Sequence, residues 1–223
     1  MKVSDAVAQR ISVRAFKPDP VPGHLVREIL EMARRAPSGG NLQPWRVYAL
    51  GGQPLAEFKA VIAAKLAAGE SETPEYDVYP HSLWEPFKTR RFDTGAQRYK
   101  ALGVDNKDKA ALKELGERNY RFFGAPVGLF YCLDRNLGPP QWSDMGMYMQ
   151  TVMLLAAEHG LDTCPQESWS NWPVSVRAFL NLPDDLMLFA GMSMGYRDPG
   201  HPLNAIRTER EPFETFAQMR GFD

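Results

Sequence analysis

The sequence predicts one large domain of the α+β or α/β class. Its 223 residues are 44% hydrophobic and 24% charged, so the chain can bury a sizeable core and fits one domain better than two. Segments with helical spacing of apolar residues occur together with compact apolar runs of strand length. Since no internal repeat or low-complexity block divides the chain, we expect residues 1–223 to form a single domain.

The N-terminal part of the chain predicts two helices and a strand. Residues 4–10 predict a short helix capped by Ser4, and Val13–Phe16 predicts an extended stretch that runs into three prolines. Apolar residues then recur at helical spacing from Gly23 to Arg35. Turn-forming residues end this helix before a predicted strand at Arg46–Leu50.

The middle of the chain combines a helix with a long irregular segment. We expect a helix over residues 54–68. Residues 69–123 predict an excursion over the core, rich in Pro, Tyr, Trp, Phe and Arg, with a polar helix over residues 107–120. The apolar run Val127–Asp134 predicts a buried strand, where the chain enters the sheet again.

The last part of the chain contains the longest predicted helix. Trp142–His159 is apolar nearly all round, which indicates a buried central helix, and Gly160 provides its C-terminal stop. Further elements are expected as a strand at 161–164, a helix at 173–180 and a buried strand at Leu186–Met194. Residues 195–223 are polar and contain prolines, so we expect them to form an arm.

The composition argues against several classes of partner. Lys and Arg total 26 against 27 acidic residues, so neither nucleic acid nor an anionic membrane is expected as a partner. Cys132 and Cys164 have no metal-type spacing to the histidines, so we expect no metal site and no disulfide scaffold. No apolar run approaches the roughly 18 residues of a membrane span, and the N-terminus does not resemble a signal peptide. We therefore expect a cytoplasmic protein that binds a small ligand.

Several familiar enzyme motifs are absent from the sequence. It contains no GxGxxG that opens a βαβ unit, no GxxxxGK[ST], no GxSxG and no HExxH. A Rossmann dehydrogenase, a P-loop NTPase, a serine hydrolase and a zinc protease are therefore unsupported. If the chain is an enzyme, we expect a cofactor to carry the reaction.

Two groups of arginines suit an anionic ligand. Arg10, Ser12 and Arg14 place two guanidinium groups and a hydroxyl next to a break in the chain. Arg207 and Arg210 add a second pair in the tail. Arginine forks match the geometry of phosphate oxygens. Taken alone, each group is more often a set of exposed charges with ordinary ion pairs.

Two loops suit a planar ligand. Pro37–Trp45 ends a helix with two glycines and with Ser, Asn and Gln side chains, which can donate to and accept from a flat heterocycle. The alternative is an ordinary helix stop. Pro165–Ser168 follows an apolar strand, a common place for ligand loops. Its carboxylate at Glu167 has no identified partner, so we do not expect an acid catalyst there.

In their order along the chain, these segments resemble the nitroreductase superfamily of FMN enzymes. The motifs are Arg10-Ile-Ser-Val-Arg14, Ala36–Trp45, Gly160–Glu167, Gly195-Tyr196 and Asn204-xx-Arg207-xx-Arg210. The resemblance spans nearly the whole chain. It implies an α+β fold with a mixed sheet flanked by helices. It also implies an intertwined homodimer that exchanges C-terminal arms and holds two FMN molecules between its subunits.

The resemblance implies a set of FMN-binding residues. They are Arg10, Ile11, Ser12, Arg14, Pro37, Ser38, Gly39, Asn41, Pro165, Gln166, Glu167, Arg207 and Arg210. Arg10 and Ser12 would hold the phosphate and ribityl chain with one of the two tail arginines. Arg14 would place a cation near N1 and the C2 carbonyl of the isoalloxazine. The glycine loop would come from the other subunit, and the backbone N–H of Glu167 would point at flavin N5.

The reaction implied by the resemblance is a ping-pong hydride transfer. NAD(P)H gives hydride to flavin N5 and leaves, and a flat electron-poor acceptor such as a nitroaromatic or a quinone takes its place. No catalytic side chain is expected, because the flavin carries the chemistry. Alternatives are another reaction on the same fold, such as reductive dehalogenation or flavin reduction, or a flavin-binding protein without turnover.

Aromatic residues of the 69–123 excursion are candidates for a lid over the flavin. We expect either the Trp84–Arg91 stretch or Phe122 and Phe123 to contact the small aromatic acceptor. The alternative is that these aromatic side chains belong to a satellite of the core.

Overall fold

The sheet of the computed structural model, which describes residues 1–222, has four strands in the order β1-β2-β4-β3. The strands are β1 (Arg46–Gly51), β2 (Val127–Asp134), β3 (Asp162–Gln166) and β4 (Leu186–Gly195). All three strand pairs are antiparallel, so the predicted mixed sheet is wrong for this chain. The reason is that β4 inserts between β2 and β3, which run in the same direction, and pairs antiparallel with both. An isolated bridge between Ser12 and Thr163 provides a parallel contact.

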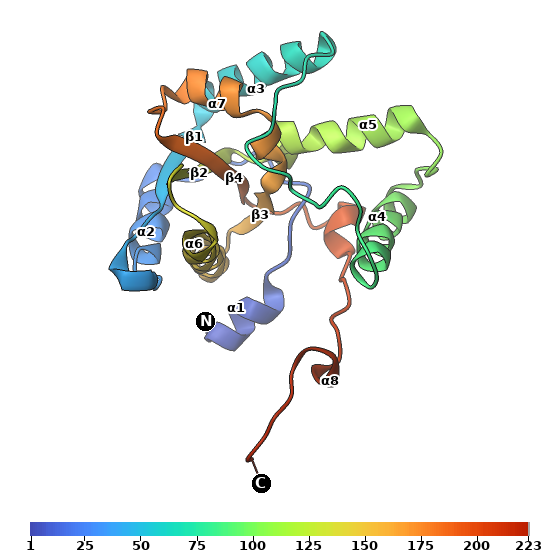
Figure 1. Cartoon of the computed structure of the whole chain (residues 1–223). Helices are drawn as coiled ribbons and strands as arrows, with labels where there is room; N and C mark the ends of the chain where they lie inside the picture. Colours follow the sequence, from blue (N-terminus) through green and yellow to red (C-terminus); the bar gives the residue numbers. More distant parts are fainter. Residues whose placement is uncertain (223) are drawn as a thin grey trace.

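The side chains of the sheet alternate between two apolar clusters, one on each face. On β2, Leu129 and Tyr131 point into the first cluster, and Phe130 and Cys132 point into the second. The first face is covered by α2 (Gly23–Ala33) and α6 (Pro139–Glu158), and the second by α3 (Gly52–Ala67) and α7 (Pro173–Leu180). Figure 1 shows the sheet between these two helical layers. The α+β class is therefore confirmed.

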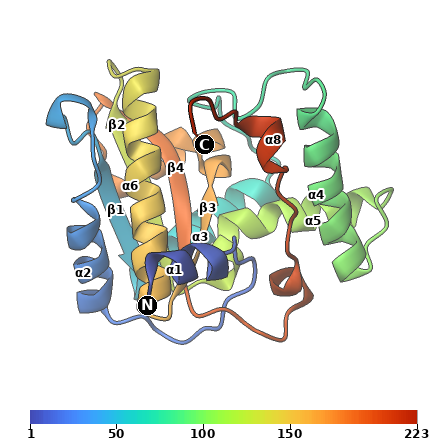
Figure 2. The ribbon, with the colours of Figure 1, turned by 90° about the horizontal axis from the view of Figure 1, so that it is seen from below.

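The remaining helices lie outside these layers. They are α1 (Val3–Gln9), α4 (Phe87–Leu102), α5 (Lys109–Glu117) and α8 (Phe213–Phe216), with 3-10 turns η1 (Gly39–Asn41), η2 (Arg118–Gly124), η3 (Glu167–Asn171) and η4 (Pro202–Ala205). Figure 2 shows α1 across α6. The N-cap of α1 is Lys2 rather than the predicted Ser4, because the Asp5 carboxylate accepts from the Lys2 N–H at 3.2 Å. Among residues 1–222, no helix is both long and apolar enough to cross a membrane.

The 69–123 segment is more regular than the sequence predicts. It contains α4, a helix of 16 residues where no periodicity was expected. None of the residues of α4 is buried, so this helix has no apolar stripe by which a sequence pattern could reveal it.

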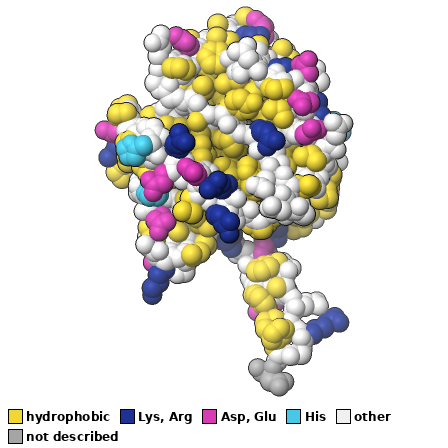
Figure 3. Space-filling view, turned by 90° about the vertical axis from the view of Figure 1, so that its left-hand side faces the viewer, with side chains coloured by type: hydrophobic (Ala, Val, Ile, Leu, Met, Phe, Trp, Pro, Cys, Tyr) yellow, Lys and Arg dark blue, Asp and Glu magenta, His cyan; other side chains and the backbone are white. Residues whose placement is uncertain are grey.

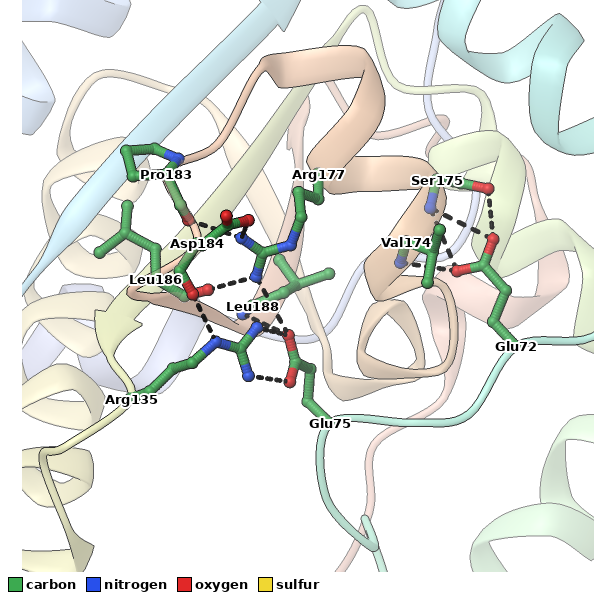
Figure 4. Close-up of polar contacts among 10 residues, drawn as sticks. All are labelled: Glu72, Glu75, Arg135, Val174, Ser175, Arg177, Pro183, Asp184, Leu186 and Leu188. Atoms are coloured by element: carbon green, nitrogen blue, oxygen red, sulfur yellow. Dashed lines mark hydrogen bonds and ion pairs between the residues drawn. The ribbon is translucent and has the colours of Figure 1, made fainter.

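The segment begins with a strap, residues 70–76, that two glutamates hold against the core (Figure 4). The Glu72 carboxylate accepts hydrogen bonds from the backbone N–H groups of Val174 at 2.8 Å and Ser175 at 3.1 Å, at the start of α7. The Glu75 carboxylate accepts both bonds of the Arg135 guanidinium, each at 2.8 Å. Since both glutamate side chains are nearly buried, these charge-assisted contacts fix the strap.

The chain leaves the domain gradually after η4. The Asn204 side chain still donates to the carbonyl of Ala15 at 2.8 Å, and the Glu211 carboxylate pairs with Arg90 of α4 at 2.8 Å. Residues 206–222 form an extended tail that carries α8 away from the domain (Figure 1). Apolar side chains line this tail (Figure 3), among them Phe213, Phe216 and Met219, which are 47%, 69% and 59% exposed.

Candidate functional site

The first and last of the sequence-predicted segments meet around one cavity of about 470 Å³. Sequence-predicted residues that line it are Arg10, Ile11, Ser12, Arg14, Arg207 and Arg210. Asn204 joins the two segments, because its side-chain oxygen accepts from the Arg14 backbone N–H at 3.0 Å while its amide donates to Ala15. Residues almost two hundred positions apart in the sequence thus share one wall.

The guanidinium groups of this cavity have no carboxylate among the described residues that line it. Arg207 donates to the carbonyl of Asn204 at 2.9 Å, and Arg210 donates to the carbonyl of Thr208 at 3.0 Å. Burial lowers the pKa of Arg10, and the nearby charge of Arg210 lowers it further. A group of like charges with only neutral partners fits an anion with several acceptor oxygens, as a phosphate has.

A second cavity, of about 410 Å³, lies beside the first and is lined by Pro165, Gln166 and Glu167. The two cavities have Arg14 and Arg98 in common. The reason for this proximity is the bridge from Ser12 to Thr163, which places the first motif against β3 two residues before Pro165. The first cavity and the junction of β3 and η3 therefore belong to one continuous site.

The sequence predicts a loop at Pro165–Ser168, but Pro165 and Gln166 form the end of β3 and Glu167 begins η3. Gln166 is 2% exposed, and its side chain donates to the carbonyl of Asn119 at 2.7 Å and accepts from the Ser193 hydroxyl at 2.6 Å. Trp169 of η3 lies against the bare backbone of Gly191, where an added Cβ would be 2.2 Å from the indole Cδ1. These contacts give the junction of β3 and η3 a fixed position at the edge of the second cavity.

Cys164 also lines the second cavity, and burial raises its pKa to about 11. The sulfur therefore stays a neutral thiol near pH 7, so it does not supply a nucleophile.

Two arginines of α4 belong to the site. Arg98 is half-buried and lines both cavities. Burial lowers its pKa, and the charge of Arg14 lowers it further. Arg91, the last residue of the Trp84–Arg91 stretch that the sequence offers as a lid, lines the second cavity, and its guanidinium carbon lies 4.1 Å from the ring centroid of Tyr79. No motif indicates Arg98, for which the only sequence signal is the arginine content of the 69–123 segment.

The structure does not bring the glycine loop to these cavities within one chain. Pro37, Ser38, Gly39 and Asn41 line neither of them. The loop is instead fixed on α6, where the Gly39 N–H donates to Asp144 at 3.2 Å. Asn41 has φ +57°, a left-handed backbone conformation that is costly for residues other than glycine. Strain of this kind often marks a functional loop.

The predicted lid residues differ in their surroundings. Phe122 has no exposed surface and stacks on Trp169, with ring centroids 4.7 Å apart, and Phe123 is 6% exposed. The lid prediction is therefore wrong for this pair, because left-handed backbone at φ +52° and +54° turns both rings into the core. Trp84 is 61% exposed, packs on Phe87 and lines neither cavity.

One side of the second cavity is formed by the end of the strap and the residues that follow it. These are Tyr76, Asp77, Val78 and Tyr79. The Tyr76 hydroxyl donates to the carbonyl of Phe189, so this wall is tied to β4. The 69–123 excursion thus contributes to the site through residues that no motif revealed.

Comparisons with known proteins find similar sequences over nearly the whole chain. A model of the "Nitroreductase family" matches residues 7–196. The chain is 36% identical to a "4-nitrobenzoate reductase" of Pseudomonas putida over 97% of this chain and 95% of that protein. It is 39% identical to a "Chloronitrobenzene nitroreductase" of Comamonas testosteroni over 96% of each chain.

Solved structures show the same similarity. One, an "FMN and NADPH-dependent nitroreductase NfnB" from sphigopyxis sp. strain HMH, is 44% identical with a TM-score of 0.95 over 100% of both chains. Another, the "FMN-dependent nitroreductase NfnB" from Mycobacterium smegmatis in complex with NADPH, is 30% identical with a TM-score of 0.91, over 98% of this chain and 100% of that one.

Proposed function

Because this chain belongs to the nitroreductase family, we propose that it uses FMN to pass hydride from NAD(P)H to nitroaromatic acceptors. The observation that carries the proposal is the pair of joined cavities. One is lined by arginines without a carboxylate, and the other is lined by the end of β3 and the start of η3. This donor set suits a phosphate at one end and a planar heterocycle at the other.

The phosphate end of FMN lies in the first cavity. Arg10 and Ser12 hold the phosphate and ribityl chain from one side, and Arg207 and Arg210 approach from the tail. All four residues line the same cavity, which supports their assignment. Ile11 contributes to the cavity wall beside them.

The ring end of FMN lies in the second cavity, where Arg14 and Arg98 place two cations. When bound, FMN supplies the atom that takes the hydride and passes it on. Positive charge beside the ring stabilises the negative charge that hydride brings, and so favours reduction. Pro165, Gln166 and Glu167 line the ring edge, and the backbone N–H of Glu167 is directed at N5. The protein thus orients the reactants and tunes the charge around them.

The complete site belongs to a homodimer that exchanges its C-terminal arms. In this proposal Pro37, Ser38, Gly39 and Asn41 reach the flavin of the other subunit. Two observations support it: the glycine loop does not reach the cavities of its own chain, and the extended tail exposes aromatic side chains. We also propose a cytoplasmic location.

The visible spectrum of the purified protein tests the proposed function. We expect a yellow protein with bound FMN, which bleaches when NAD(P)H is added without oxygen and regains its colour when a nitroaromatic compound follows. A flavin that NAD(P)H cannot bleach would favour a binding protein without turnover. Recovery of colour only with free flavin or a halogenated compound would favour another reaction on the same fold.

A further inference from the structure

The outer face of α4 carries a third cavity, of about 510 Å³, next to the two that hold FMN in the proposed function. We propose that this cavity binds the 2′-phosphoadenosine half of NADPH and makes the enzyme prefer NADPH to NADH. The inference rests on the proposed function, because it concerns the donor of the same reaction.

One face of α4 provides most of the wall of this cavity. The helix contributes Lys88, Arg91, Phe92, Gly95, Ala96 and Tyr99. Their spacing of three and four residues places them on the same side of a helix. Thr94 and Arg98 line the first cavity instead. Since α4 has no buried residue, core packing does not account for the pattern of its side chains. We attribute this pattern to the first and third cavities, which different sides of the helix line.

The third cavity adjoins the second through Arg91, which lines both. The Arg91 guanidinium lies over the ring of Tyr79, a residue of the second cavity. A dinucleotide with its nicotinamide end in the second cavity therefore passes Arg91 when its adenosine end enters the third. This position suits the pyrophosphate, which NADH and NADPH have in common.

The charges of the third cavity favour an additional phosphate. None of the described residues that line it is acidic. Arg90, the neighbour of Arg91 in sequence, is paired with Glu211 at 2.8 Å, whereas no ion pair of Lys88 or Arg91 occurs among residues 1–222. Lys88 lies about one helical turn before Arg91 and lines the third cavity but not the second. We assign it to the 2′-phosphate that only NADPH carries.

The aromatic side chains of this cavity fit the adenine. Phe92 is 68% exposed although it is a large apolar residue, and Tyr99 lines the cavity about two turns further along the helix. Exposed aromatic rings are costly on a surface without a partner, and they offer a flat face on which a base can stack.

The test compares Lys88→Gln and Arg91→Gln with the matched control Lys100→Gln. Lys100 lies on the same helix and lines none of the three cavities. The FMN-loaded enzyme is assayed for kcat/KM with NADPH and with NADH at a fixed nitroaromatic concentration. Binding of adenosine 2′,5′-bisphosphate and of adenosine 5′-phosphate is measured by calorimetry on the same preparations.

We expect the wild-type enzyme to prefer NADPH at least tenfold. Lys88→Gln should lose roughly tenfold or more of kcat/KM with NADPH and bind adenosine 2′,5′-bisphosphate correspondingly more weakly, the loss expected for one charged hydrogen bond, while NADH is unaffected. Arg91→Gln should weaken both donors, and Lys100→Gln neither.

Equal use of NADH and NADPH by the wild type would overturn the inference while leaving the proposed function intact. The same holds if Lys88→Gln keeps the wild-type ratio of the two donors. Absence of nitroaromatic reduction with either donor would contradict the proposed function instead, and the binding of adenosine 2′,5′-bisphosphate would still report on the cavity.

Discussion

Arginine side chains in this protein differ by the partners they have. Arg135 and Arg197 pair with the carboxylates of Glu75 and Asp162, as surface and interface arginines commonly do. Arg207 and Arg210, by contrast, donate to carbonyl oxygens of the tail. This difference in partners, which the sequence does not contain, separates arginines that stabilise the fold from those available to a ligand.

Replacing Arg10 by Gln should weaken FMN binding by roughly tenfold or more, because the phosphate would lose a charge-assisted hydrogen bond. Fluorescence titration of the flavin measures the dissociation constant. Arg34→Gln, at the exposed arginine that caps the C-terminus of α2, serves as the control and should bind FMN like the wild type. Equal affinity of Arg10→Gln and the control would contradict the phosphate assignment.

His201, the N-cap of η4, should make the stability of the fold sensitive to pH. Its ring accepts from the Leu203 N–H at 3.3 Å and lies 3.4 Å from an Arg118 nitrogen. Burial lowers the pKa of His201 below its usual value of about 6.5, and the charge of Arg118 lowers it further, against the opposing effect of Asp198. The unfolded chain therefore binds this proton more readily, so stability falls as the pH drops below about 6.5.

The measurement is the urea midpoint at several pH values between 5 and 7. In His201→Gln the loss of stability toward pH 5 should be smaller than in the wild type. His24→Gln, an exposed histidine of α2, should keep the wild-type pH dependence. If both variants follow the wild type, His201 does not contribute to this pH dependence.

At the scale of elements, the pattern of apolar residues predicts secondary structure where a segment is buried. The apolar runs at β2 and β4 and the periodicity of α2 predict these elements nearly at their observed bounds, because burial imposes the pattern. α4 has no buried side, and the insertion of β4 between β2 and β3 depends on contacts distant in sequence. Neither feature could therefore be predicted from the sequence. Without α4, the place of Arg98 in the site could not be predicted either, and Arg91 was indicated only as the end of the Trp84–Arg91 stretch.

The contact between Trp169 and β4 should tolerate no added methyl group. Gly191→Ala would place its Cβ 2.2 Å from the buried indole. We therefore expect the free energy of unfolding to fall by about 1–3 kcal/mol or more. We also expect the junction of β3 and η3 to be displaced and the protein to bind less flavin. Urea unfolding and the ratio of flavin to protein absorbance measure these effects.

Gly116→Ala on α5 is the matched control, because a Cβ there meets no atom within 4 Å. This variant should be at least as stable as the wild type, since alanine is the better helix former. If Gly191→Ala has the stability and the flavin content of the wild type, the position of Trp169 does not depend on the absence of a side chain at residue 191.

At the scale of the whole molecule, contacts within the domain do not account for the apolar side chains of the tail. Phe213 and Phe216 pack on one another, with ring centroids 5.7 Å apart, and both are exposed. The family resemblance implies that a second copy covers them, but strand and helix patterns within one chain contain no information about a partner. For the same reason, the role of the glycine loop cannot be read from the chain alone.

The double variant Phe213→Ser/Phe216→Ser should shift the protein from dimer toward monomer, because the arm would lose the apolar area that it buries on its partner. Light scattering coupled to size-exclusion chromatography measures the mass at several concentrations. Val174→Ser, which removes an exposed apolar side chain of α7, should leave the mass unchanged. A monomeric wild type would remove the basis for an exchanged arm.

In a binding site, the same residues usually both attach the backbone to the core and contact the ligand. Here the strap, residues 70–76, provides the attachment separately. Glu72, Glu75 and Tyr76 carry the attachment to the core, so residues 77–84 can vary without loosening the backbone that precedes them. A mutant library confined to residues 77–84 should therefore yield folded enzymes with altered acceptor range. The same diversity within the strap should yield mostly unstable protein. This division gives the fold a short, evolvable stretch at the wall of its active site.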